Sequence, residues 1–332
     1  MWMRKKLIAR DSPKSAMPFH NRFDLPREDQ HDVSPAWFER QKQRPVQGQD
    51  SSLRDWLGME VDALKAFHDA HMNADEAALS MTNPLSTSSG PALGGYSDEI
   101  VAVCNLWRVI IAALMEWPCK LVPAIFELLN AIAKLPGNIH KGEAVNDEGE
   151  KLTWAQLPYF GMIWYESATG AGIQPGQICR RYSDSPSVEL ARKLYLKVKN
   201  IEAQLVAKHV LKLNKAMIQL IIRALEKEID ESDKQLAPDE ATGYDQVKLD
   251  FHIPAVSFMF KYNGREVYDQ VVTKKLGNWT TRQLPDGVGE FRNGAERWSV
   301  WKKRLEELSQ GNADGEVRAA AQASLKYISW NA

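Results

Sequence analysis

The chain of 332 residues contains little cysteine and no long apolar segment. Its three cysteines, Cys104, Cys119 and Cys179, are far apart, form no CxxC pair and are odd in number, which argues against a disulfide framework. We therefore expect a reducing, cytoplasmic environment. No stretch approaches the roughly 18 consecutive apolar residues of a membrane span, and the basic start of the chain lacks the apolar region of a signal peptide. The sequence thus predicts no membrane partner.

An excess of charge of one sign is also absent. The 42 Lys and Arg residues balance 43 Asp and Glu residues and leave a formal net charge of -1. Binding to nucleic acid requires a basic face that neutralises phosphates. We therefore expect no nucleic-acid partner.

Motifs for nucleotide, metal and nucleophile chemistry are missing as well. The glycine-rich "SGPALGGY" lacks the lysine of a phosphate loop, and no Gly-x-Ser-x-Gly elbow occurs. We expect no cofactor and no bound metal. One alternative is a metal site made of His68, His71 and Asp75, which a continuous helix would place on one face. An exposed polar face explains the same residues.

Apolar residues recur at spacings of three and four, whereas strand-like alternation is nearly absent. This pattern predicts an all-α, multi-helix globular fold, with an extended N-terminal arm over residues 1–50 and a single all-helical domain over residues 51–332. Aromatic residues in the arm indicate docking on its own domain or on a second subunit, so a homodimer is one expected outcome. The expected helices include 51–81, 121–135, 185–232 with a break near 213–214, 250–262, 265–274, 295–309 and 315–329.

Aromatic residues are concentrated in "QLPYFGMIWYESATGAG", residues 156–172. Rings with hydroxyl groups, a carboxylate and a glycine-rich segment suited to a lid are typical of a pocket for a flat, partly polar ligand. Core packing is the alternative explanation for the same rings. A further histidine, His209, lies on the apolar stripe of the longest expected helix, which indicates a core imidazole.

Two other segments combine rings with polar groups: "DFHIPAVSFMFKY" (residues 250–262) and the start of the helix "GAERWSVWKKRLEELS". We expect these segments and the aromatic stretch to line one apolar cavity that the loop 170–176 closes. The catalytic candidates are Glu166, His252, Arg108 and Tyr159. The substrate-binding candidates are Trp107, Phe160, Trp164, Tyr165, Phe251, Phe258, Tyr262 and Trp298.

The order of "LWRVIIAAL", "LPYFGMIWYE", a long helix, "DFHIPAVSFMFKYNGREVY" and "ERWSVWKKRL" resembles a family of filamentous-fungal proteins known as domain of unknown function 3632. The resemblance extends from Ile100 to the C-terminus. It implies a cytosolic, all-helical protein, and some such proteins are encoded beside secondary-metabolite pathways. Through that association it implies a cofactor-free hetero-Diels–Alder reaction that joins a tropolone quinone methide to a terpene alkene.

The expected function is therefore a cofactor-independent enzyme of fungal secondary metabolism that acts on small-molecule substrates. One alternative is a non-catalytic helical interaction protein in which the aromatic clusters are core. The other is a metal-dependent enzyme built on His68, His71 and Asp75. The first alternative assigns the aromatic residues to the core instead of a pocket. The second uses the histidines and the aspartate that the first hypothesis leaves without a role.

Overall fold

The computed structural model describes residues 33–46, 51–86, 96–136, 152–170, 175, 178–179, 185–226, 248–273 and 294–329. Within these ranges the regular structure is helical and no strand occurs, which confirms the predicted all-α class. None of the helices within the described ranges is both long and apolar enough to span a membrane. The elements in chain order are α1 (Pro35–Lys42), α2 (Ser51–His68), α3 (Ala74–Ser86), α4 (Tyr96–Glu116), η2 (Cys119–Leu121), α5 (Val122–Ala133), η3 (Trp154–Gln156), α6 (Phe160–Gly170), α8 (Ser185–Ala207), α9 (Lys215–Glu226), α10 (Leu249–Tyr268), the π-helical turn η5 (Asp269–Thr273), α11 (Gly294–Gln310) and α12 (Gly315–Ile328).

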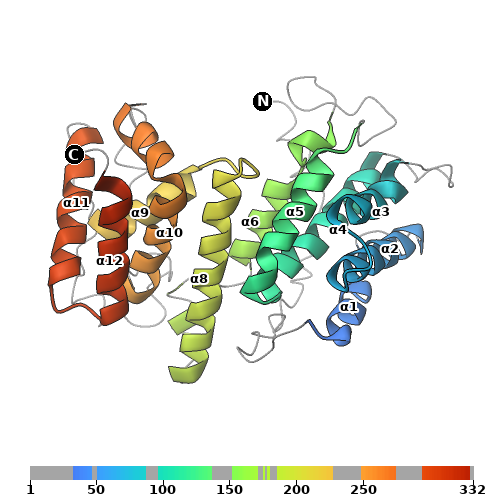
Figure 1. Ribbon diagram of the computed structural model, residues 1–332, viewed down its shortest axis with the longest axis horizontal. Helices are drawn as coiled ribbons and strands as arrows, with labels where there is room; N and C mark the ends of the chain where they lie inside the picture. Colours follow the sequence, from blue (N-terminus) through green and yellow to red (C-terminus); the bar gives the residue numbers. More distant parts are fainter. Residues whose placement is uncertain are drawn as a thin grey trace, which may run out of the picture.

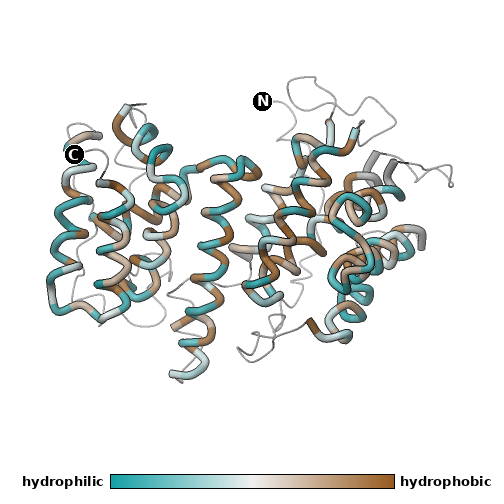
Figure 2. Tube along the Cα trace, viewed as in Figure 1, coloured by the Kyte–Doolittle hydropathy of each residue, from teal (hydrophilic) through white to brown (hydrophobic). Residues whose placement is uncertain are grey.

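The helices follow one another along the long axis of the molecule, with α1–α4 at one end, α5, α6 and α8 in the middle, and α9–α12 at the other end (Figure 1). α4 packs against α2, α5, α6 and α8, and α10 packs against α8, α9 and α12. Hydrophobic and hydrophilic positions alternate around the helices, as expected of amphipathic helices (Figure 2). The buried apolar side chains form one cluster that extends from Trp37 to Ile328.

Part of the expected N-terminal arm is an ordered helix. α1 starts at Pro35, where a missing backbone N–H costs nothing because the first helical N–H groups have no partner within the helix. Trp37 and Phe38 are 5% and 1% exposed and belong to the core. The arm therefore docks on its own chain through α1. Residues 1–32 and 47–50 lie outside the described residues.

The single helix expected over residues 51–81 was wrong, because the chain forms α2 and α3 with a tight turn between them. Ala70 in this turn has a left-handed φ of 59°. The N–H of His71 donates back to the carbonyl oxygen of Ala66 at 2.8 Å and closes the end of α2. Apolar spacing continues across the turn, so periodicity alone did not reveal it.

The break expected within residues 185–232 exists, and it lies at residues 208–214 between α8 and α9. His209 begins this connection with a left-handed φ of 58°, and the N–H of Val210 donates to the carbonyl oxygen of Leu205 at 2.9 Å. His209 is exposed, so its expected place in the core was wrong. The physical reason is that α8 ends before the residue and releases it from the apolar stripe.

The two helices expected at 250–262 and 265–274 are joined in α10, which continues to Tyr268. A kink replaces the expected gap, because Asn263 has a non-helical φ of -132°. Its side-chain amide donates to the carbonyl oxygen of Ala203 at 2.8 Å, which ties the kink to α8. The helices expected near the C-terminus are confirmed as α11 and α12.

Candidate functional site

Five of the predicted substrate-binding rings lie in the core. Trp107, Phe160 and Trp164 have no exposed surface, and Phe251 and Trp298 are 1% and 4% exposed. Side chains this deeply buried contact protein neighbours. In the described structure these rings therefore stabilise helix packing.

Trp107 of α4 holds the segment that leads into α6. Its Nε1 donates to the carbonyl oxygen of Pro158 at 2.6 Å. Its ring meets Phe160 at 5.5 Å and Trp154 at 6.2 Å in edge-on geometry, which aromatic pairs prefer. Trp107 and Phe160, the first group of candidates, thus take part in the packing of α4 against η3 and α6.

The polar candidates of the aromatic stretch differ in burial. Glu166 is exposed, and Tyr159 is half-buried with a left-handed φ of 64°. The phenol oxygen of half-buried Tyr165 accepts a hydrogen bond from the side-chain amide of Asn214, just before α9. Burial raises the pKa of Tyr165 above its usual range, so the phenol stays neutral.

His252 lies in the first part of α10 and is 6% exposed. Its Nδ1 lies 2.7 Å from the carbonyl oxygen of Lys248, to which it can donate. Burial lowers the pKa of His252 to about 4, which keeps the imidazole neutral. The neighbouring ring of Phe251 packs edge-on against Tyr195 of α8 at 5.6 Å.

The remaining candidates, Trp298, Phe258 and Tyr262, lie on α11 and α10. Trp298 meets Phe260 at 5.8 Å and Tyr268 at 5.1 Å, again edge-on. Phe258 and Tyr262 are half-buried on α10. The contacts of Trp298 thus pack α11 against α10.

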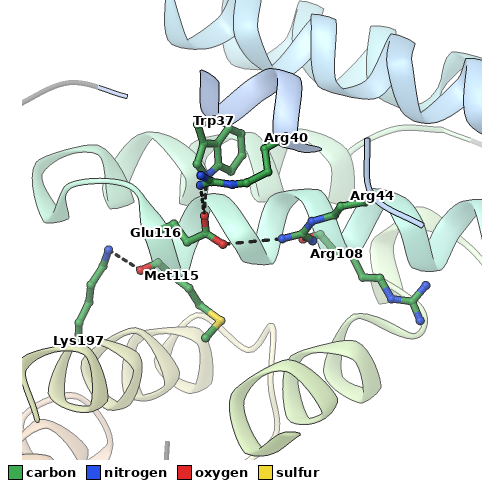
Figure 3. A network of polar contacts seen from close by, with 7 residues as sticks. All are labelled: Trp37, Arg40, Arg44, Arg108, Met115, Glu116 and Lys197. Atoms are coloured by element: carbon green, nitrogen blue, oxygen red, sulfur yellow. Dashed lines mark hydrogen bonds and ion pairs between the residues drawn. The ribbon is translucent and has the colours of Figure 1, made fainter. Parts of the chain in front are cut away.

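Glu116 at the end of α4 contacts side chains of α1 and of the segment that follows α1 (Figure 3). Trp37 Nε1 donates to Glu116 Oε2 at 2.8 Å, and Arg40 Nη2 lies 3.2 Å from the same oxygen. Arg44 Nη2 lies 3.7 Å from Oε1. The network fixes α1 on the body of the protein.

Arg108, the fourth catalytic candidate, contributes its backbone to this region. Its carbonyl oxygen accepts a hydrogen bond from Arg44 Nη1 at 3.2 Å. The Arg108 guanidinium points away from Glu116 (Figure 3) and donates to Asn105 Oδ1 at 3.1 Å. Arg108 of α4 and Glu166 of α6 both act electrostatically on Cys104, so these two catalytic candidates lie near the same thiol.

Lys197 of α8 caps the other side of the α4 terminus. Its Nζ donates to the carbonyl oxygen of Met115 at 2.8 Å and to that of Trp117 (Figure 3 shows the first bond). Burial lowers the pKa of Lys197 to about 8. The side chain supplies donors to helix-end carbonyls that have no partner within α4.

The ring contacts of the predicted site residues include those of Trp107 with α6, of Phe251 with α8 and of Trp298 with α10. Two cavities lie elsewhere, one beside α5 and α8 and one at the α2–α3 turn, and none of the twelve residues lines either. Residues 171–174 and 176 of the expected lid lie outside the described residues. The catalytic and binding roles of the twelve residues remain predictions.

The alternative metal site is not formed. α2 ends at His68 and α3 begins at Ala74, so His68, His71 and Asp75 do not share one helical face. Within the described ranges no group of three or more His, Cys, Asp or Glu side chains could hold a metal ion. The turn at Ala70 separates residues that the expected continuous helix would have aligned.

The larger of the two cavities, the α5–α8 cleft, has a volume of about 590 Å³. It lies between α5, η3 and the C-terminal end of α8. Apolar side chains and six polar side chains, one of them the carboxylate of Glu127, share its surface. The lining residues are Pro123, Phe126, Glu127, Leu129, Asn130, Ala133, Ala155, Gln156, Leu157, Gln204, Lys208, His209 and Val210.

Two lining residues of the α5–α8 cleft have strained backbones. Leu157 and His209 have left-handed φ values of 42° and 58°, which cost energy in residues other than glycine. Lys208 Nζ lies 5.4 Å from the ring centroid of Phe126, in cation–π range. The cleft thus offers an apolar wall, a cation and an imidazole within one concave surface.

Most of this cleft has no signature in the sequence. Asn130, Gln156, Gln204 and Lys208 resemble ordinary polar positions on helix surfaces. They become neighbours only because α5, η3 and α8 pack together. His209 was predicted to be a core imidazole because it lies in an apolar pattern. The structure exposes it because α8 ends before this residue.

Comparison with known proteins identifies one family. The model of DUF3632, described as a protein family of unknown function, matches residues 107–305. No curated protein and no solved structure matches the chain. The matched segment begins in α4, ends in α11 and contains the whole lining of the α5–α8 cleft. It covers more than half of the chain, and the protein therefore belongs to the DUF3632 family.

Proposed function

We propose that the protein is a cofactor-independent enzyme of secondary metabolism whose small-molecule substrates bind in the α5–α8 cleft. The observation that carries the proposal is the cleft itself, with its volume of about 590 Å³ and its mixed apolar and polar lining. Ligand pockets of proteins span about 300–1,000 Å³ and combine apolar walls with a few orienting polar groups. The position of the cleft inside the family segment supports the same conclusion.

The proposed reaction is the hetero-Diels–Alder joining of an oxygenated quinone methide, of the polyketide tropolone type, to a terpene alkene. The resemblance to the fungal family supports this choice. A cycloaddition needs two partners held face to face, and correct placement can contribute about 7–11 kcal/mol by saving translational and rotational entropy. Phe126, Leu129 and Leu157 suit the alkene, whereas Asn130 and Gln156 suit the oxygenated partner.

A proton donor is needed if the quinone methide forms from a hydroxymethyl precursor. The ring hydroxyl loses its proton, the C–O bond of the hydroxymethyl group breaks, and the departing oxygen takes up a proton and leaves as water. Lys208 and His209 are the cleft residues that carry suitable N–H groups. General acid catalysis of this kind contributes about 10²–10⁴-fold in rate.

The test is an assay of the purified full chain with a hydroxymethyl tropolone and a cyclic terpene alkene, read by mass spectrometry of the adduct. We expect a rate above the protein-free background. Lys208→Gln should lower that rate by at least about tenfold if Lys208 is the proton donor. The matched control is Lys212→Gln, which removes an exposed lysine that does not line the cleft.

Equal rates with and without protein would reject the enzymatic proposal, and equal losses in the two lysine variants would reject the site. The second candidate function is a non-catalytic helical interaction protein. The observation that favours it is the burial of Trp107, Phe160 and Trp164, which makes the most aromatic stretch of the chain part of the core. It predicts no adduct formation in the same assay.

A further inference from the structure

The second cavity, the α2–α3 cleft, lies where the α2–α3 turn faces the start of α5. Its volume is about 450 Å³. Its α2–α3 side precedes the matched family segment, whereas its other side belongs to it. The lining residues are Phe67, His68, Ala70, His71, Met72, Asn73, Glu76, Trp117, Leu121, Ala124 and Glu127.

The charge of this lining has one sign. Glu76 and Glu127 are carboxylates, and no lysine or arginine is among the described lining residues. Asn73 and Glu76 are already paired in a capping box: Glu76 N–H donates to Asn73 Oδ1 at 3.0 Å, and Asn73 N–H donates to Glu76 Oε2 at 2.9 Å. Glu76 is exposed and is an acceptor at both oxygens. The cleft therefore disfavours anions.

His68 adds an oriented imidazole to the lining. Its Nδ1 lies 2.8 Å from Asp69 Oδ1. Hydrogen bonds from Lys65 and then from His68 lower the pKa of Asp69, so the carboxylate is ionised and can only accept. Nδ1 must therefore carry the proton of this hydrogen bond.

Aromatic rings complete the cleft. The ring of Trp117 lies 5.2 Å from that of His68, and the ring of Phe38 of α1 lies 5.7 Å from it. These contacts hold the imidazole between α1 and the end of α4. Trp117 and Phe67 both line the cleft, and aromatic faces attract organic cations within about 6 Å.

We propose that the α2–α3 cleft is a binding site for a small aromatic amine in its ammonium form. The ammonium group supplies several N–H donors, and the carboxylates of Glu76 and Glu127 are the acceptors in the lining. The ring of the ligand packs against Trp117 and Phe67. This site is separate from the α5–α8 cleft and does not depend on the proposed reaction, although Glu127 borders both cavities.

The experiment compares three ligands of the same size and different charge: 2-phenylethylamine, 2-phenylethanol and phenylacetate. Histidine ring signals of the full chain, labelled with ¹³C at the imidazole, are followed by NMR, and His68→Gln assigns the signal of His68. We expect a saturable shift of the His68 signal with the amine. The alcohol should bind at least tenfold more weakly and phenylacetate should cause no shift.

Variants test the origin of the binding. Glu76→Gln retains the capping box because glutamine also serves at this position. It should weaken amine binding at least tenfold, which corresponds to about 1.4 kcal/mol. Glu306→Gln removes the same charge from an exposed site on α11 and should leave the dissociation constant unchanged.

Three results would overturn the proposal. One is the absence of a saturable His68 shift at millimolar amine. Another is binding of phenylacetate as strong as that of the amine. The third is an equal loss of affinity in Glu76→Gln and Glu306→Gln, which would make the attraction a property of the net charge. Far-ultraviolet circular dichroism of each variant establishes that the fold is retained.

Discussion

His252 shows how burial changes the meaning of a single polar residue. It is 6% exposed, and its pKa falls to about 4 from the ordinary value of 6.5 because burial disfavours the charged form. Between these two values the unfolded chain binds a proton that the folded chain does not bind. The free energy of unfolding therefore decreases as pH falls through this window.

For this reason we expect His252→Leu to reduce the acid sensitivity of the protein. The wild type should lose about 1.4 kcal/mol per pH unit within the window through this residue, and the variant should lack that contribution. Urea unfolding at pH 7 and at pH 5 measures the difference. His71→Gln, which removes an exposed histidine, should behave as the wild type. Identical pH dependence of His252→Leu and the wild type would contradict the expectation.

The same burial makes His252 costly to remove, so His252→Ala should lower the melting temperature. Glu166 is exposed, so Glu166→Gln should leave the melting temperature nearly unchanged. The catalytic role of Glu166 stays a prediction.

At the scale of helices, a buried ion pair joins α9 to α11. Arg297 Nε lies 2.8 Å from Glu226 Oε1, and their side chains are 7% and 1% exposed. Trp301 Nε1 donates to the same oxygen at 2.6 Å. Burial raises the pKa of Glu226, whereas Arg297 and Trp301 oppose this rise. The pair specifies which faces of α9 and α11 meet.

Removal of one partner should therefore be costly. We expect Arg297→Met to lower the free energy of unfolding by about 3–5 kcal/mol, because a carboxylate remains buried without its cation. Arg304 lies on the same helix and pairs with Glu307 at 3.2 Å in a more exposed position. Arg304→Met should cost about 0–1 kcal/mol. Chemical denaturation measures both, and equal costs would show that burial of the pair is unimportant.

At the scale of the whole molecule, continuity of the core is the main feature. The buried apolar cluster includes side chains from α1 at one end and α12 at the other. α8 connects the two ends, because it packs against α4 on one side and α10 on the other. The single domain over residues 51–332 remains a prediction. The predicted homodimer remains a prediction.

A continuous core predicts one cooperative unfolding transition. Far-ultraviolet circular dichroism and tryptophan fluorescence should give the same midpoint in urea, because helices and rings at both ends lose their packing together. Arg297→Met should shift both midpoints equally although the substitution lies near one end. Two separate midpoints, with only one affected by the variant, would instead indicate two domains.

Sequence by itself determined the helical class and several helices closely. Apolar spacings of three and four are local properties, so they predicted α11 and α12 within one or two residues. Aromatic content correctly indicated that the arm docks, because Trp37 and Phe38 are too apolar to remain in water. Turns were harder to predict, since left-handed residues such as Ala70 and His209 have no distinctive side-chain type.

Only the tertiary structure decided which polar and aromatic residues share a surface. The predicted site grouped Glu166, His252 and Trp298 by their composition, yet their helices place them in different packing contacts. The α5–α8 cleft instead joins Asn130, Gln156 and Lys208 from separate segments. Helical periodicity records which side of a helix is buried, but it contains no information about the distance between two helices. That distance depends on how side chains far apart in the sequence pack together, and the same packing determines where clefts form between the helices.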